Sequence, residues 1–147
     1  MNKKVLVILS LLVIMAGTSI IYAASNENTV QVDDFEFNIP DGFVENVTAE
    51  AVNEKTSSGG VEYTYCQKLF EKGLFEVISI LVAEYGGYEV TDEIVSAMGG
   101  EKTTINDVDG YLGNESGIFI FSYPKEGKLV TITVTDKELF DEIVIKE

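Results

Sequence analysis

The sequence of 147 residues contains no histidine, no arginine and no tryptophan, and it has a single cysteine. Without histidine there is no Ser-His-Asp or Cys-His triad, no imidazole metal ligand and no imidazole base that titrates near neutral pH. Without arginine there is no bidentate guanidinium group to bind phosphate or carboxylate. These absences exclude much enzyme chemistry and leave carboxylates as the only plentiful reactive side chains.

The single cysteine, Cys66, cannot form a disulfide within the chain, so stability must come from the hydrophobic core. One interpretation of Cys66 is a reactive thiol or an intermolecular bridge. The other is a small hydrophobic side chain buried in a strand. Only Lys68 stands close by in the sequence to activate the thiol, which favours the buried interpretation.

Acidic residues far outnumber basic ones, and the formal net charge is −15. Residues 25–147 alone hold 8 Lys and 25 Asp plus Glu, which gives −17. Such a surface repels phosphate backbones and anionic lipid headgroups, so we expect no nucleic-acid partner. The charge serves either to keep the protein soluble through self-repulsion or to attract cations or a basic partner.

The first 24 residues resemble an export signal. Lys3 and Lys4 precede an apolar run over residues 5–24, which ends in small residues, as in a secretory signal peptide. The run is also close to the roughly 20 residues that a membrane-spanning helix needs. Residues 1–24 are therefore a signal peptide or an N-terminal membrane anchor, and no cysteine is placed for a lipoprotein anchor. Both alternatives predict export, to the outer face of the cell membrane or beyond it.

Periodicity in the remainder predicts one α+β domain at 30–147, joined through a short tether at 25–29. The fold expected is an antiparallel β-sheet of about five to seven strands flanked by two or three helices. Segments with strand-like alternation lie at 30–39, 61–69, 74–85, 102–106, 108–113, 118–121 and 128–134. The strand at 30–39 breaks its period at Asp33 and Asp34, which suggests a bulge. The middle of 74–85 is apolar on both faces, so we expect helices to cover it.

Three helices and one loop complete this prediction. Thr48 is expected to cap a short helix, and residues 56–60 are expected to form a loop. A second helix should follow Thr91. A capping box at 135–138 predicts a C-terminal helix with Phe140 on its apolar side.

Two stretches resemble a known superfamily. Residues 30–43 read VQVDDFEFNIPDGF, and residues 105–111 read INDVDGY, with GKLVTI following at 127–132. The first stretch resembles the opening of PsbP-like domains, a strand followed by I-P-x-G and an aromatic residue. The whole chain is also similar to small exported proteins, common in archaea, that combine a signal segment with one such domain. The resemblance implies an antiparallel sheet flanked by helices and a binding or accessory role, and it assigns no functional residues.

Carboxylate pairs are the candidates for chemistry. Asp33 and Asp34 are adjacent on a predicted strand, so their side chains should point to opposite faces and share no substrate. Asp107 and Asp109 would share a face if extended, and they are weak candidates for a calcium site completed by a distant carboxylate. An EF-hand is excluded, because alignment on Gly110 puts Ile105 and Ser116 where acidic ligands are required. The alternative for this segment is a solvated turn in which Gly110 adopts an unusual backbone angle.

Two further patterns concern the surface. Asn46 and Asn114 begin N-glycosylation sequons, and Asn114 lies in the more exposed predicted turn. Several tyrosines either form a binding surface or pack half-buried on the sheet. These tyrosines are Tyr63, Tyr65, Tyr85, Tyr88 and Tyr111.

The sequence thus favours a non-catalytic extracytoplasmic binding or accessory domain without a cofactor. Its partner would be an extracytoplasmic protein or ligand, and membrane contact would come only through residues 1–24 if they are retained. Two alternatives stay open: a calcium-stabilised cell-surface module, and a small carboxylate-dependent hydrolase.

Overall fold

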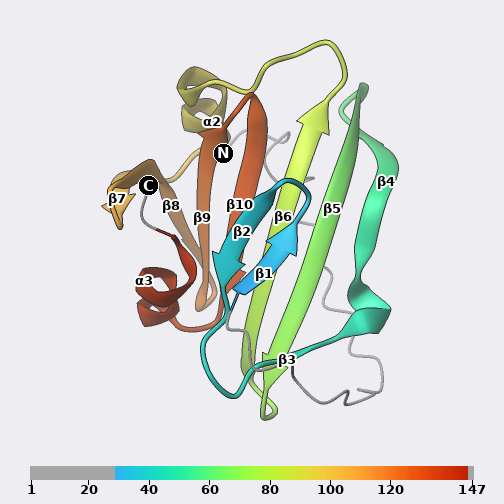
Figure 1. Cartoon of the computed structure of the whole chain (residues 1–147). Coiled ribbons are helices and arrows are strands. Elements are labelled where there is room, and N and C mark those ends of the chain that lie inside the picture. The colour runs from blue at the N-terminus through green and yellow to red at the C-terminus, as the bar shows by residue number, and fades with distance from the viewer. Residues whose placement is uncertain (1–28, 146–147) are drawn as a thin grey trace.

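The computed structural model of the chain describes residues 29–145, in which an eight-stranded sheet is accompanied by a two-stranded hairpin and two short α-helices (Figure 1). The strands are β1 (Thr29–Val32), β2 (Phe35–Asn38), β3 (Val44–Glu45), β4 (Ala51–Ser58), β5 (Val61–Lys72), β6 (Glu76–Tyr85), β7 (Glu101–Ile105), β8 (Val108–Glu115), β9 (Ile118–Lys125) and β10 (Lys128–Val134). The helices are α2 (Asp92–Met98), α3 (Phe140–Ile143) and two 3₁₀ turns, Val47–Ala49 and Lys137–Leu139. The antiparallel α+β prediction is confirmed, whereas five to seven strands was too few.

The predicted export segment at 1–24 lies outside the described residues. Among residues 29–145, no helix combines the length and apolar character needed to cross a bilayer.

The large sheet has the order β3-β5-β6-β10-β9-β8-β7, and β4 pairs with β5 beside β3. Every pairing in it is antiparallel. The central pair is β6 and β10, in register from Leu129 opposite Ala83 to Val134 opposite Ile78. Central strands need apolar side chains on both faces, which explains the hydrophobic run in β6, interrupted only by Ser79.

Successive side chains of β6 and β10 point to opposite faces and build two separate cores. Val82 and Val130 belong to the larger core, which is covered by the β1–β2 hairpin and by α3. Ala83 and Leu129 belong to the smaller core, which is covered by α2. Figure 1 shows the hairpin lying across the front of the central strands. The sheet is therefore covered by a β-hairpin as well as by the helices that the sequence predicted.

The predicted single strand at 30–39 is wrong, because the chain forms the β1–β2 hairpin there. Asp33 turns the chain with a φ of 55°, a left-handed conformation that aspartate tolerates better than most residues. The break in period that suggested a bulge is this turn. Val32, Phe35 and Phe37 face the large core, each at most 5% exposed.

The helix expected from Thr48 is also wrong, because only the 3₁₀ turn Val47–Ala49 forms before β4 begins at Ala51. The loop expected at 56–60 is reduced to Gly59 and Gly60, since β4 runs on to Ser58. β4 buries almost nothing, so its polar sequence carries no alternation to mark it. Its pairing with β5 holds it in place.

The C-terminal segment forms as expected but with a different cap. Asp136, rather than Thr135, accepts the capping hydrogen bond, from the backbone N–H of Glu138 at 3.0 Å. Thr135 instead accepts a hydrogen bond from the backbone N–H of Val77 at 3.0 Å, which ties the segment to β6. Phe140, only 1% exposed, docks the short helix onto the large core.

Candidate functional site

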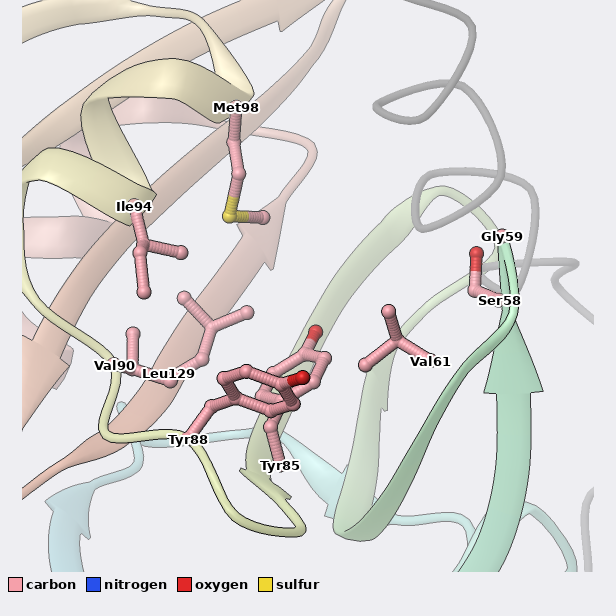
Figure 2. A pocket seen from close by; sticks show the side chains of 9 residues that line it. All are labelled: Ser58, Gly59, Val61, Tyr85, Tyr88, Val90, Ile94, Met98 and Leu129. Atoms are coloured by element: carbon pink, nitrogen blue, oxygen red, sulfur yellow. The ribbon is translucent and has the colours of Figure 1, made fainter.

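An open apolar groove of about 280 Å³ lies on the α2 side of the sheet (Figure 2). Figure 2 shows the side chains of α2 and of the β6–α2 loop facing those of the β4–β5 turn across this space. The lining residues are Ser58, Gly59, Val61, Tyr85, Tyr88, Val90, Ile94, Met98 and Leu129. Apart from Ser58 and the two tyrosine hydroxyls, their side chains bring no polar group to the groove.

Backbone hydrogen bonds fix the wall that carries Tyr88. The N–H of Tyr88 donates to the carbonyl of Tyr85 at 3.1 Å across a Gly-Gly turn in which Gly87 has a φ of 81°. The N–H of Val90 then donates to the carbonyl of Gly127 at 2.8 Å, which attaches the loop to the β9–β10 turn. These contacts fix the backbone of the loop that carries Tyr88 and Val90.

Helix α2 continues this wall, on the side of the groove that faces the β4–β5 turn. Its single fully buried residue, Val95, anchors it in the smaller core. The neighbouring Ile94 is left 43% exposed, and Tyr88 across the loop is 67% exposed. Two large apolar side chains therefore line a groove and yet contact solvent, which folding alone does not require.

The five tyrosines divide between the two interpretations, and Tyr65 is half-buried against the smaller core, as the packing interpretation expects. Tyr63 and Tyr111 are buried, and the Tyr111 hydroxyl donates to Asp92 at 3.0 Å, so both are packing residues. Tyr85 and Tyr88 line the groove. Burial, and then the nearby Tyr63, raise the pKa of Tyr85 to about 12.

This raised pKa predicts a loss of stability at high pH. The folded protein keeps the Tyr85 proton to about pH 12, whereas a tyrosine in the unfolded chain releases it near pH 10. The contribution of the neutral phenol to stability is therefore fully present below about pH 10. As the pH rises through 12, the free energy of unfolding should fall by at most about 2–3 kcal/mol. A Tyr85→Phe variant should lose less stability than the parent over this range, measured by urea unfolding at stepped pH. Equal losses would contradict the assignment.

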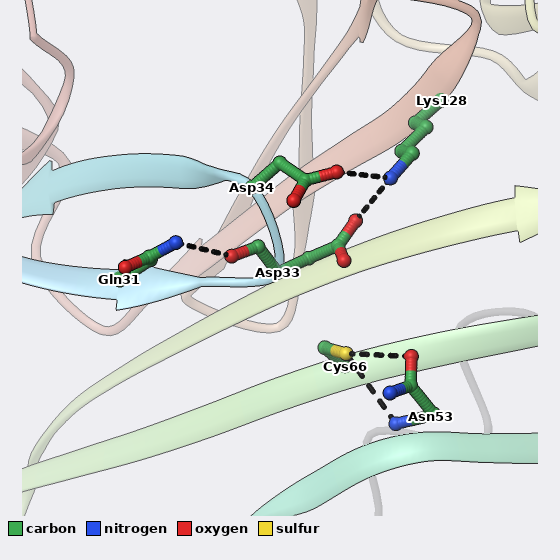
Figure 3. Close-up of polar contacts among 6 residues, drawn as sticks. All are labelled: Gln31, Asp33, Asp34, Asn53, Cys66 and Lys128. Carbon is green, nitrogen blue, oxygen red and sulfur yellow. Dashed lines mark hydrogen bonds and ion pairs between the residues drawn. The ribbon is translucent and has the colours of Figure 1, made fainter.

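Asp33 and Asp34 behave differently from the prediction that they point apart. Because they occupy the turn of the hairpin, both carboxylates bind one ammonium group, Lys128 Nζ, at 2.6 and 2.9 Å (Figure 3). Hydrogen bonds to both carboxylates raise the pKa of Lys128 above its ordinary value. A lysine of β10 thus balances one of the two negative charges, and the ion pairs fasten the hairpin to the sheet.

Asp107 and Asp109 do not share a strand face. Asn106 and Asp107 form the tight turn between β7 and β8, with φ values of 49° and 65°. Asp109 lies in β8 and accepts a hydrogen bond from the Thr104 hydroxyl at 2.6 Å. Within residues 29–145 no three Asp, Glu, His or Cys side chains are grouped for a metal, so nothing there favours the calcium site.

Gly110 has an ordinary backbone angle, and the expectation of an unusual one is wrong. Its role is steric, because a Cβ at this position would lie 2.6 Å from Cε2 of Phe121. Glycine lets the Phe121 ring, which is fully buried, lie against the backbone of β8.

Cys66 is a buried residue of the large core, as the second interpretation predicted. Its sulfur accepts a hydrogen bond from the backbone N–H of Asn53 at 3.4 Å and lies 3.7 Å from the Asn53 side-chain oxygen (Figure 3). Asn53 has a φ of 52° where the β4–β5 register shifts. The thiol supports this irregularity and is not available at the surface.

No protein-family model matches the chain, and no curated protein or solved structure is significantly similar to it.

The two sequons differ in accessibility. Asn46 is 5% exposed, its amide donates to Glu71 at 3.3 Å, and its oxygen accepts a hydrogen bond from the Thr48 hydroxyl at 2.6 Å. Asn114 is exposed near the end of β8. In the folded protein, Asn114 is therefore the better acceptor of the two.

Sequence reasoning did not find the groove as a unit. Its residues come from four separated segments of the chain. The helix expected after Thr91 carried no signal that Val95 would face the core while Ile94 would stay exposed. The tyrosine pattern did name two of its residues, Tyr85 and Tyr88, as part of a possible binding surface.

Proposed function

We propose that this chain is an exported, non-catalytic binding domain whose groove binds a basic amphipathic peptide segment of an extracytoplasmic partner protein. The observation that carries the proposal is the open apolar groove lined by Tyr88 and Ile94, two side chains that folding leaves exposed.

The size of the groove favours a peptide over a free small molecule. Its volume of about 280 Å³ lies below the roughly 300–1,000 Å³ typical of pockets that enclose a whole ligand. It suits a few apolar side chains projecting from one face of a bound segment, as in helix-in-groove recognition. Tyr85 and Tyr88 add aromatic surface with hydroxyls that can hydrogen-bond to the peptide backbone.

Charge favours a basic segment. The chain carries a formal charge of −15, and its lysines are outnumbered on the domain itself. Glu89 stands between the lining residues Tyr88 and Val90, and Glu93 precedes the lining residue Ile94; both glutamates are exposed. A segment with lysine or arginine beside its apolar side chains would be attracted to this end of the molecule and released more readily in salt.

The absence of a catalytic role is proposed from the engagement of the carboxylates. Asp33 and Asp34 neutralise Lys128, and Asp109 accepts from Thr104. No described observation favours the hydrolase or the calcium module over the binding domain.

We also propose the PsbP-like assignment. The antiparallel sheet with helices on both faces supports it. So does the turn at 40–43, in which the N–H of Phe43 donates to the carbonyl of Pro40 and Gly42 has a φ of 89°.

A peptide titration tests the binding proposal. The probes are a short amphipathic peptide of leucine and lysine, and the same peptide with glutamate in place of each lysine. Methyl NMR should show shifts at Ile94 and Leu129 with the lysine peptide and much weaker binding of the glutamate peptide. An Ile94→Asn variant should lose about tenfold in affinity, because the contact of one aliphatic side chain is worth about 1.5 kcal/mol.

The matched control is Val52→Asn. Val52 is 62% exposed on β4 and does not line the groove. The Val52→Asn variant should bind the lysine peptide with the same affinity as the parent. Equal affinity of the parent for both peptides, or unchanged affinity in Ile94→Asn, would overturn the proposal.

A further inference from the structure

The turn between β5 and β6 presents two large apolar side chains to solvent. Leu74 is 89% exposed and Phe75 is 83% exposed, the highest values among the large hydrophobic residues described. Figure 1 shows this turn projecting below the lower ends of β9 and β10, at the end of the molecule away from α2. Isolated exposed hydrophobic residues are common, but an adjacent pair at a projecting tip suggests a contact surface.

Strand pairing between β5 and β6 supports the turn that carries Leu74 and Phe75. β5 and β6 stay in register up to Lys72 opposite Glu76, and Gly73 turns the chain with a φ of 64°. Lys72 also places its ammonium 5.6 Å from the centre of the Phe43 ring, in the segment that leads to β3. Leu74 and Phe75 thus stand on a paired hairpin with no core of their own.

The chain enters the domain on the side of this tip. At the far end of the β1–β2 hairpin, Asp33 binds Lys128, at the groove end of β10. Thr29 pairs with Asn38 at the opposite end of the same hairpin, which in Figure 1 is the end nearer the β5–β6 turn. Residues 25–28 reach at most about 14 Å when extended. If residues 5–24 are an anchor, so short a tether would hold the end of the domain that carries the β5–β6 turn close to the membrane.

We propose that Leu74 and Phe75 insert into the surface of the membrane in which residues 5–24 are anchored. The inference rests on the proposed export and takes residues 1–24 as a retained anchor, and it adds a second membrane contact to the one expected from the sequence. Two side chains bind a bilayer weakly alone, but the tether supplies a high local concentration of lipid. The groove, at the other end of β5 and β6, then faces away from the membrane.

The favoured lipid is electrically neutral. Asp41, Glu71 and Glu76 lie in the segments around the tip, and the chain as a whole carries −15. Anionic headgroups would be repelled, so the tip should insert into phosphatidylcholine better than into a bilayer rich in phosphatidylglycerol.

The absence of tryptophan from the sequence provides a direct test. The full chain with Phe75→Trp is reconstituted in phosphatidylcholine vesicles, with or without lipids brominated near the headgroup end of the acyl chain. The emission of the new tryptophan should be blue-shifted and quenched by the bromines, and both effects should diminish when phosphatidylglycerol is added.

The matched control is Tyr88→Trp in the full chain, because Tyr88 is 67% exposed at the opposite end. Its emission should be unaffected by bromines. Emission from Phe75→Trp that is neither blue-shifted nor quenched in phosphatidylcholine would overturn the proposal. A blue shift that grows with protein concentration, without quenching by the brominated lipids, would also overturn it, because it indicates contact between copies of the chain. The peptide titration reports on the groove and the tryptophan quenching on the tip. A negative quenching result therefore leaves the proposed function standing, and a negative titration leaves the membrane contact standing.

Discussion

A Phe140→Ala variant should lower the free energy of unfolding by about 3–5 kcal/mol, the range for truncating a fully buried aromatic residue. Phe140 is 1% exposed, and its ring centre lies 5.9 Å from that of Phe121. The α-helical turn that carries it has only four residues, so its position depends on this side chain rather than on helix propensity.

Urea denaturation followed by circular dichroism measures the effect, with Phe75→Ala as the control. Phe75 is 83% exposed, and the same substitution there removes no packing contact of comparable size. The Phe75→Ala variant should unfold within about 0.5 kcal/mol of the parent. Equal stability of the two variants would mean that α3 does not hold the core as described.

A Gly110→Ala variant should be destabilised by about 3 kcal/mol, the upper end of the usual cost of overpacking. The added Cβ would lie 2.6 Å from Cε2 of Phe121 and 2.7 Å from the backbone oxygen of Ser122. Neither neighbour has room to withdraw, because Phe121 is fully buried and Ser122 is paired with Tyr111 in the sheet.

Gly113→Ala, in the same strand, is the matched control. A Cβ at Gly113 would meet only the Ile120 oxygen, at 3.9 Å, and Gly113 has no positive φ. Since alanine also restricts the unfolded chain, Gly113→Ala should be neutral or stabilising by up to about 1 kcal/mol. Similar thermal shifts in the two variants would show that the close contact at Gly110 is relieved at little cost.

Regular alternation made the central strands predictable. In β10, Val130, Ile132 and Val134 face the large core, in agreement with the strand-like alternation at 128–134, because successive side chains of a strand point to opposite faces. The double-faced run in β6 likewise indicated a covered central strand. The cover was harder to foresee, because a two-stranded hairpin leaves no helical period in the sequence.

Segments without a buried face were misjudged for the opposite reason. β4 pairs along β5 with most of its side chains exposed, so hydrogen bonding rather than hydrophobic pattern determines its structure. Asp33 and Asp34 were placed on opposite faces because a strand was assumed. Their common partner, Lys128, is 95 residues away from Asp33 in the sequence, and no local signal links the two.

That separation has a consequence for how the chain reaches its folded state. Of the described strands, β1 and β2 are made first, whereas β10, which supplies Lys128 and part of the surface beneath the hairpin, is made last. During synthesis, Phe35 and Phe37 therefore remain uncovered until β10 has also been made. Folding of this domain therefore depends on distant contacts that form late, and until then the apolar side chains of the hairpin stay available to chaperones.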